Sequence, residues 1–304
     1  MNVLGIHHVT SVTGQISSNR RFYTDFLGLR LVKKSVNQDD VSAYHLFYAD
    51  SVGTPGTDLT FFDWPSIGAN RPGLATISRT TMRVAGSALE AWQVRFSEGG
   101  VPFERDEDAA GRARLLFADP EGQSLALVDD AGLPGEVVSW TQTVSAELGT
   151  RGILGVDLTS ARPDSTRRVL TELLGYKDVD GGRFEVITAS SASEINVIES
   201  PSRSFGSVGA GGVHHVAFRV KDDEELRAFQ DRIESAGLQT SGYVDRYYFH
   251  SLYFREPGGV LFELATDGPG MAVDQSLDEL GTKLSLPPFL ESRRAAIEAN
   301  LKPL

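Results

Sequence analysis

Cysteine is absent from this chain of 304 residues. Its absence excludes disulfides, thiolate metal ligands and cysteine nucleophiles, so any metal site must be built from histidine and carboxylate side chains. The absence also fits a reducing compartment. The N-terminus has no basic segment followed by a long apolar one, so we expect no signal peptide and a cytoplasmic protein.

Long apolar runs and positive charge are also scarce. No segment approaches the roughly 20 apolar residues that a membrane-spanning helix requires. Lys and Arg number 29 against 41 Asp and Glu, which gives a formal net charge of −12. Nucleic-acid and anionic-membrane binding both need clustered basic side chains. We therefore expect neither nucleic acid nor a membrane as a partner.

Two sequence patterns each occur twice. FYTDFLGLRLV at residues 22–32 resembles VLTELLGYKDV at residues 169–179. LFADPEGQSLALVDD at residues 116–130 resembles YFREPGGVLFELATD at residues 253–267. Such internal repeats indicate repeated structural units. The chain is therefore predicted to consist of two tandem halves.

Each half divides again, because four segments share the order of a strand, an amphipathic helix that ends at glycine, and three more strands. The helices are expected at residues 19–27, 88–98, 164–174 and 223–236. A single βαβββ module has an open sheet edge and a half-buried face, so it should pair with another. We predict an α+β fold of four βαβββ modules paired into two domains. The predicted boundaries are 1–130 for the N-terminal domain, 150–268 for the C-terminal domain and 269–304 for a helical tail.

Four of the six histidines form two His-His pairs, each opening a strand at the start of a module. Neighbouring side chains on a strand point to opposite faces, so one histidine of each pair can face a shared cavity. Alignment of the modules places His8 and His215 at one equivalent position, where the second and third modules have Arg79 and Gly155. His45 is interpreted as a packing or supporting residue, as is the sixth histidine, His250.

Glu263 lies inside the apolar run VLFEL, where a carboxylate is costly unless it is paired or bound to a metal. The aligned residue is Ala126 in the second module and Phe61 or a neighbour in the first. We therefore predict a metal site formed by His8, His215 and Glu263. Two histidines and one carboxylate form the ligand set of non-haem Fe(II) oxygenases, which leaves positions for substrate and O2, although Zn, Mn, Co or Ni would also fit.

These residues resemble those of a known superfamily. HHVT…FYTDFLGL in the first module and HHVAFRV…REPGGVLFEL in the last are similar to the vicinal-oxygen-chelate superfamily, which includes glyoxalases, extradiol dioxygenases and bleomycin-resistance proteins. The resemblance covers nearly the whole chain and implies a glyoxalase-like fold. Catechol extradiol enzymes draw their ligands from the two C-terminal modules, which Gly155 does not fit. Ligands from the first and last modules instead resemble those of the hydroquinone and chlorohydroquinone ring-cleaving dioxygenases.

That resemblance implies an Fe(II)-dependent ring-cleaving dioxygenase that acts with O2 on hydroquinone-type, or catechol-type, aromatic diols. It implies that the partners are a small aromatic substrate and O2. Five further residues occupy positions that match the catalytic machinery of the subfamily: Arg246, Tyr253, His7, His214 and Thr10.

The residues around Arg246 agree with this expectation. Arg246 is always charged and can stabilise a phenolate, unless it forms a surface ion pair with Asp245. Tyr253 can donate to a reacting oxygen or hold the distal hydroxyl of the ring. Aromatic residues of the first and last modules are expected either to line a pocket for a flat ring or to pack in the core. They are Phe61, Phe62, Trp64, Tyr247, Tyr248, Phe249 and Phe254.

Two other functions on the same fold stay open at this point. A glyoxalase-like isomerase or lyase usually needs a fourth protein ligand, often a second Glu, and Phe61 at the fourth position argues against it. A non-enzymatic, small-molecule-binding resistance protein needs no metal and leaves the triad unexplained. Exchange of modules between chains would give a homo-oligomer, but the long linker leads us to favour closure within one chain.

Overall fold

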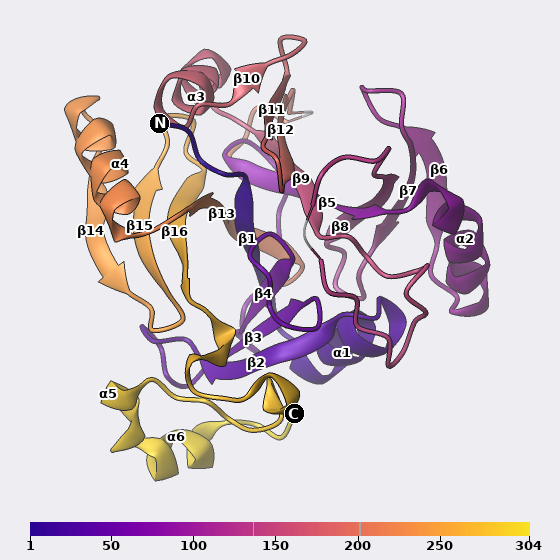
Figure 1. The fold of residues 1–304 in the computed structure, drawn as a ribbon, viewed down its shortest axis with the longest axis vertical. Coiled ribbons are helices and arrows are strands. Elements are labelled where there is room, and N and C mark those ends of the chain that lie inside the picture. The colour runs from indigo at the N-terminus through magenta and orange to yellow at the C-terminus, as the bar shows by residue number, and fades with distance from the viewer. Residues whose placement is uncertain (136, 201) are drawn as a thin grey trace.

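The structure is a computed structural model that describes residues 1–135, 137–200 and 202–304. The same order of elements occurs four times along the chain (Figure 1). The first module contains β1 (Ile6–Thr13), α1 (Ile16–Arg21), β2 (Arg30–Val36), β3 (Tyr44–Ala49) and β4 (Asp58–Asp63). The second contains β5 (Thr76–Val84), α2 (Leu89–Glu98), β6 (Phe103–Glu107), β7 (Ala113–Ala118) and β8 (Ser124–Asp129). The third contains β9 (Ile153–Thr159), α3 (Pro163–Arg168), β10 (Lys177–Asp178), β11 (Arg183–Ile187) and β12 (Ala192–Ile198). The fourth contains β13 (Gly212–Val220), α4 (Asp223–Ser235), β14 (Thr240–Asp245), β15 (Phe249–Arg255) and β16 (Leu261–Pro269).

The first helix begins at Ile16, three residues earlier than predicted, whereas the module helices end where the sequence predicts. They do so because α1 and α3 continue as π-helical turns at Phe22–Phe26 and Val169–Leu173. In α4, the Asp222 side chain accepts a hydrogen bond from the Glu225 amide, and the Glu225 carboxylate accepts one from the Lys221 amide. This cap satisfies the Glu225 amide of the first turn and the Lys221 amide just before the helix. Gly28, Gly175 and Gly237 follow the helical segments of their modules and adopt positive φ angles of 77°, 81° and 83°. These glycines end the helices because a side chain would disfavour that conformation.

The modules pair through their first strands. β1 lies antiparallel to β13, which joins the first module to the fourth, and β5 lies antiparallel to β9, which joins the second to the third. Pairing of Val213 with Ile77 links the two pairs into one sheet. Both module pairs close within one chain, and the α+β class with four βαβββ modules is confirmed. The boundaries 1–130 and 150–268 stay predictions of how the chain is divided.

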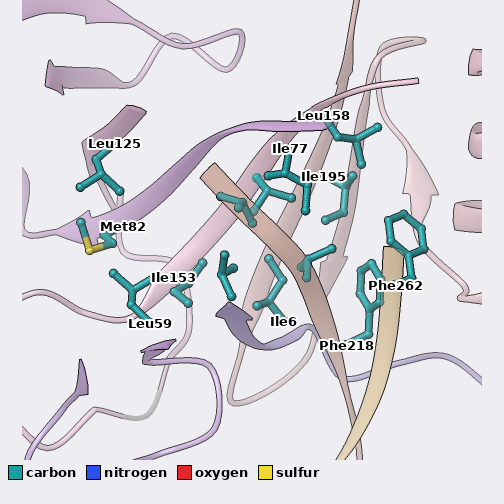
Figure 2. Close-up of a cluster of buried hydrophobic side chains, with 14 of the residues drawn as sticks. Ile6, Leu59, Ile77, Met82, Leu125, Ile153, Leu158, Ile195, Phe218 and Phe262 are labelled. Carbon is teal, nitrogen blue, oxygen red and sulfur yellow. The ribbon is translucent and has the colours of Figure 1, made fainter. Parts of the chain in front are cut away.

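All four modules contribute to one apolar core. Figure 2 shows side chains from each of them meeting around the central strands. They include Ile6 and Leu59 of the first module, Met82 and Leu125 of the second, Ile153 and Ile195 of the third, and Phe218 and Phe262 of the fourth, all at most 4% exposed. This core holds β1 and β13 side by side, which fixes the relative positions of the residues that they carry.

The last segment, residues 269–304, returns from the fourth module to the first (Figure 1). It contains the short helices α5 (Pro288–Glu291) and α6 (Arg294–Asn300), separated by irregular chain. Leu286, Leu290 and Ile297 pack against Val36 of β2. Because Pro287 and Pro288 cannot donate backbone hydrogen bonds, α5 starts at Pro288 rather than continuing from an earlier turn. The tail therefore covers the outer side of β2.

Within the described residues, the structure has no helix that combines the length and the apolar character needed to cross a membrane.

Candidate metal centre

Strand register brings residues from the two ends of the chain together. Thr10 of β1 lies opposite His215 of β13, and His8 lies opposite Ala217. Ala217 in turn lies opposite Glu263 of the parallel strand β16. The side chains of His8, His215 and Glu263 therefore meet, and each offers a ligand atom within 4.8 Å of the others. Within the described residues, they form the one such group of three.

The donor atoms of this triad approach one another without pairing. His215 Nε2 lies 2.8 Å from Glu263 Oε2, and His8 Nε2 lies 3.3 Å from the same oxygen. Despite the short separation, the directions do not satisfy hydrogen-bond geometry, and His215 Nε2 and Glu263 Oε2 have no hydrogen-bond partner in the described chain. All three side chains are at most 4% exposed. Buried polar atoms normally find partners, so atoms that converge without pairing fit a shared metal ion.

Hydrogen bonds behind the triad orient its ligand atoms. His7 Nε2 lies 3.1 Å from the Thr266 carbonyl, which can only accept, so Nε2 of His7 carries the proton. In a neutral ring, His7 Nδ1 is then an acceptor and receives a hydrogen bond from His8 Nδ1, 2.9 Å away. This leaves the lone pair of His8 Nε2 free for a metal. His214 Nδ1 and His215 Nδ1 lie 2.8 Å apart in the equivalent arrangement.

Burial and neighbouring groups set the charges of the centre. Burial, followed by the nearby His8, lowers the pKa of His7 to about 3. Burial, followed by His215, lowers the pKa of His214 to about 3, and burial also lowers the pKa of His215. Burial would raise the pKa of Glu263, but the imidazoles of His8 and His215 hold it well below its usual value. These shifts favour neutral rings at His7, His214 and His215 and an ionised carboxylate at Glu263, as binding of a divalent cation requires.

The position equivalent to Glu263 in the first module is occupied by Thr60, not by Phe61. Thr60 of β4 lies opposite Thr10, as Glu263 lies opposite Ala217. Phe61 points to the other face of the sheet and packs in the core with Tyr23. The alignment was uncertain by one residue, and a shift of one residue on a strand reverses the face. The fourth position therefore carries a neutral hydroxyl.

Beside the triad lies a pocket with about 450 Å³ of space between atoms, including the solvent at its mouth. Its polar lining includes Thr10, Asn37, Gln38, Asp39, His45 and Arg246, in addition to the triad. Its aromatic lining consists of Phe47, Phe62, Tyr248, Phe249 and Tyr253. Of the other aromatic residues that the sequence suggested, Phe61, Trp64, Tyr247 and Phe254 do not line it. Its mixed aromatic and polar lining is typical of a site for a small organic molecule.

Arg246 and Tyr253 lie together in this pocket. Arg246 Nε donates to the Tyr253 hydroxyl at 3.1 Å, and the Tyr253 ring lies beside that of His215 at 5.9 Å. The ion pair of Arg246 is made with Asp39 at 3.0 Å and not with Asp245. Gln38 also donates to the Arg246 carbonyl at 2.8 Å. The loop after β2 therefore holds Arg246 over the pocket.

Sequence reasoning did not single out His45 as a pocket residue, and the structure places it in the wall of the pocket. Its Nε2 lies 3.0 Å from the Thr60 hydroxyl, which in turn lies 2.8 Å from the Thr10 hydroxyl. The sequence signal is the alternation of His45 and Phe47 on a strand, which places both on one face. His250 lies outside the pocket and is bound to Asp223 of α4. His214 packs against Phe62 and Trp64, behind His215.

Comparison with known proteins agrees with this architecture. The family model described as "Glyoxalase/Bleomycin resistance protein/Dioxygenase superfamily" matches residues 5–127 and 151–264. A protein named "Putative ring-cleaving dioxygenase MhqA", from Bacillus subtilis strain 168, is 47% identical over 315 residues and covers 100% of both chains. A chlorohydroquinone/hydroquinone 1,2-dioxygenase from Sphingobium indicum is 29% identical over 300 residues, with 95% of this chain and 93% of that protein covered.

The same fold occurs in a solved structure. The crystal structure titled as a putative dioxygenase from Bacillus subtilis matches with a TM-score of 0.92 and 36% identity, and the match covers 100% of this chain and 98% of that one.

Proposed function

This chain belongs to the Glyoxalase/Bleomycin resistance protein/Dioxygenase superfamily, and from that premise we propose that it is a ring-cleaving dioxygenase. Its proposed substrates are hydroquinone-type aromatic diols and O2, and its proposed metal is Fe(II). The observation that carries the proposal is the buried triad of His8, His215 and Glu263, whose donor atoms converge beside an aromatic pocket. The name of the relative from Sphingobium indicum supports the substrate class.

His8, His215 and Glu263 would hold the metal. When bound, Fe(II) supplies the redox chemistry that lets an aromatic diol react with O2, which the side chains of this centre do not provide. A set of three protein ligands leaves positions open for the two reactants. Thr60 at the fourth position is compatible with that need, because a neutral hydroxyl already bonded to Thr10 is a poor competitor for the ion.

Arg246 and Tyr253 are proposed to act on the substrate. Tyr253 is neutral, because burial, followed by the nearby carboxylate of Glu263, raises the pKa of its hydroxyl. It can therefore donate a hydrogen bond to an oxygen of the ring. Arg246 brings a permanent positive charge to the same point and stabilises the phenolate that forms when the diol loses a proton.

The neutral histidines behind the ligands are proposed to hold the site in its working state. His7 accepts a hydrogen bond from the His8 imidazole, and we propose that His214 accepts one from His215 in the same way. These bonds would keep the Nε2 lone pairs of His8 and His215 directed into the centre. Thr10 contributes by keeping the Thr60 hydroxyl in a hydrogen bond.

The alternative functions explain less. A glyoxalase-like isomerase would normally use a fourth protein ligand, and Thr60 stands where that ligand would be. A binding protein without a metal leaves buried donor atoms of His215 and Glu263 unpaired, which is costly.

The decisive experiment combines metal analysis with oxygen consumption. The protein would be purified without oxygen, loaded with Fe(II) and given hydroquinone, chlorohydroquinone and catechol in an oxygen electrode. We expect one metal ion per chain and consumption of one O2 per ring opened, with hydroquinones preferred. Stoichiometric iron without oxygen uptake on any diol would refute the proposed reaction.

A further inference from the structure

The first and fourth modules share a hydrogen-bonding arrangement at equivalent positions. In the fourth module, Ser251 of β15 donates to Glu263 of β16 at 2.6 Å. In the first module, His45 of β3 lies 3.0 Å from Thr60 of β4. The strand registers make these pairs equivalent. Ser251 lies opposite Ala265, two residues after Glu263, and His45 lies opposite Phe62, two residues after Thr60. His45 thus corresponds to Ser251 and Thr60 corresponds to Glu263, but neither His45 nor Thr60 carries a carboxylate.

His45 keeps one unpaired nitrogen in the wall of the pocket. Thr60 occupies its Nε2, whereas its Nδ1 has no hydrogen-bond partner within the described residues. The ring is packed between Phe47 and Phe62, with centroids 4.0 and 4.5 Å away. Unlike the unpaired atoms of His215 and Glu263, Nδ1 of the half-buried His45 is not enclosed, so a group that enters the pocket can reach it. Its free nitrogen is suited to a ligand that brings its own hydroxyl group.

The location of His45 suits the far end of a substrate. β3 and β1 are separated by β4, so their backbones lie roughly 10 Å apart at the usual strand spacing. Side chains that point inward from both strands can span one aromatic ring. Tyr253 does not serve this far end, since its ring lies beside His215 and its hydroxyl is bound to Arg246.

We propose that His45 is a specificity-determining residue whose Nδ1 binds the second hydroxyl of a para-diol while the first hydroxyl lies at the metal centre. The inference rests on the proposed function for its substrate class. An ortho-diol directs both hydroxyls to the centre and leaves His45 without a partner, as does a phenol. The chain would therefore select hydroquinones by a hydrogen bond at the end of the pocket remote from the metal.

Binding without turnover tests this proposal. Dissociation constants for hydroquinone, catechol and phenol would be measured by calorimetry, without O2, on protein loaded with Zn(II). We expect wild-type protein to bind hydroquinone roughly 3- to 10-fold more tightly than phenol, the range for one hydrogen bond. His45→Phe should bring that ratio close to one, with phenol affinity little changed. Arg114→Gln, at the equivalent position of the second module, is the control and should retain the wild-type ratio.

Two conservative variants separate recognition from packing. The amide of His45→Asn lies close to the former Nδ1, whereas that of His45→Gln lies close to the former Nε2. Recognition through Nδ1 predicts that Asn restores the preference for hydroquinone and Gln does not. Restoration by Gln alone would show that His45 acts only through Thr60 and would overturn the proposal, as would an unchanged ratio in His45→Phe or equal wild-type affinities.

Oxygen uptake by the Fe(II)-loaded protein keeps the two proposals apart. Loss of the binding preference in His45→Phe supports the role of His45 even if wild-type protein consumes no O2, a result that would refute only the dioxygenase function. Wild-type turnover together with an unchanged ratio in the variant would refute only the role of His45.

Discussion

The pair formed by the first and fourth modules and the pair formed by the second and third share one backbone register, yet they place different chemistry at equivalent positions. His8 and Thr10 lie opposite Ala217 and His215 in one pair. Arg79 and Thr81 lie opposite Asp157 and Gly155 in the other. The position of Glu263 corresponds to Asn196, and that of Thr60 to Ala126.

In the second pair, the polar side chains at these positions hydrogen-bond to one another. Arg79 donates to one oxygen of Asp157 at 3.0 Å, and Asn196 donates to the other at 2.9 Å. In the first pair, by contrast, donor atoms of His215 and Glu263 are buried without partners. A metal centre in this fold therefore depends on which buried polar atoms lack a hydrogen-bond partner, and not on the backbone alone.

The largest effect should follow from removing the carboxylate of Glu263, in whose place the second pair has Asn196. Glu263→Gln keeps the size of the side chain but loses the charge, so metal affinity should fall by well over the roughly 10- to 100-fold that supporting residues contribute. Asn196→Ala, at the equivalent position of the second pair, should leave metal affinity unchanged. Titration with a chromophoric chelator measures the metal affinity of both variants. Equal losses of affinity would contradict the claim that only the first pair forms a metal centre.

A smaller effect is expected at the support of that carboxylate. Ser251→Ala removes the hydrogen bond to Glu263 and frees the carboxylate to rotate. Metal affinity should fall roughly 10- to 100-fold, while the ligand set stays intact. The chelator titration applies here too, and unchanged affinity would show that Glu263 is oriented by packing alone.

The second pair should respond in stability rather than in metal binding. A Cβ at Gly155 would overlap the carbonyl oxygen of Glu194 on the neighbouring strand β12. Gly155→Ala should therefore lower the free energy of unfolding by about 1–3 kcal/mol, as overpacking does, without changing metal affinity. Urea denaturation of the metal-free protein measures this. A variant as stable as wild type would show that β9 and β12 can separate enough to admit a Cβ.

The smallest expected effect is on how the stability of the metal-free protein depends on pH. Burial lowers the pKa of His7 and of His214 from 6.5 to about 3. Between these pH values, both histidines are protonated in the unfolded chain but neutral in the folded chain. Stability is then fully present above pH 6.5 and is lost as the pH falls from 6.5 toward 3, by about 1 kcal/mol per histidine near pH 5.5. His214→Asn should reduce this loss in urea unfolding measured between pH 7 and 5. An equal loss in the variant would assign the pH dependence to other groups.

Much of this comparison could be predicted from the sequence, because repeated patterns align the modules and strand alternation selects one histidine from each pair. Thr60 could not be separated from Phe61, since the loop between β3 and β4 hides the register and one residue decides the face. His45 was missed for a related reason. Its role depends on the pairing of β3 with β4, and the sequence of neither strand indicates which residues pair with which. The equivalence of Arg79 to a ligand position was visible in the sequence, but the equivalence of Asn196 to Glu263 and the ion pair of Arg79 with Asp157 were not.

The most direct test is a crystal structure of the Fe(II)-loaded protein, grown without oxygen, with anomalous diffraction measured on both sides of the iron edge. The account predicts one iron peak per chain, bounded by His8, His215 and Glu263, and none between Arg79 and Asn196. Iron bound elsewhere, or a triad whose side chains hydrogen-bond to one another around no ion, would contradict it.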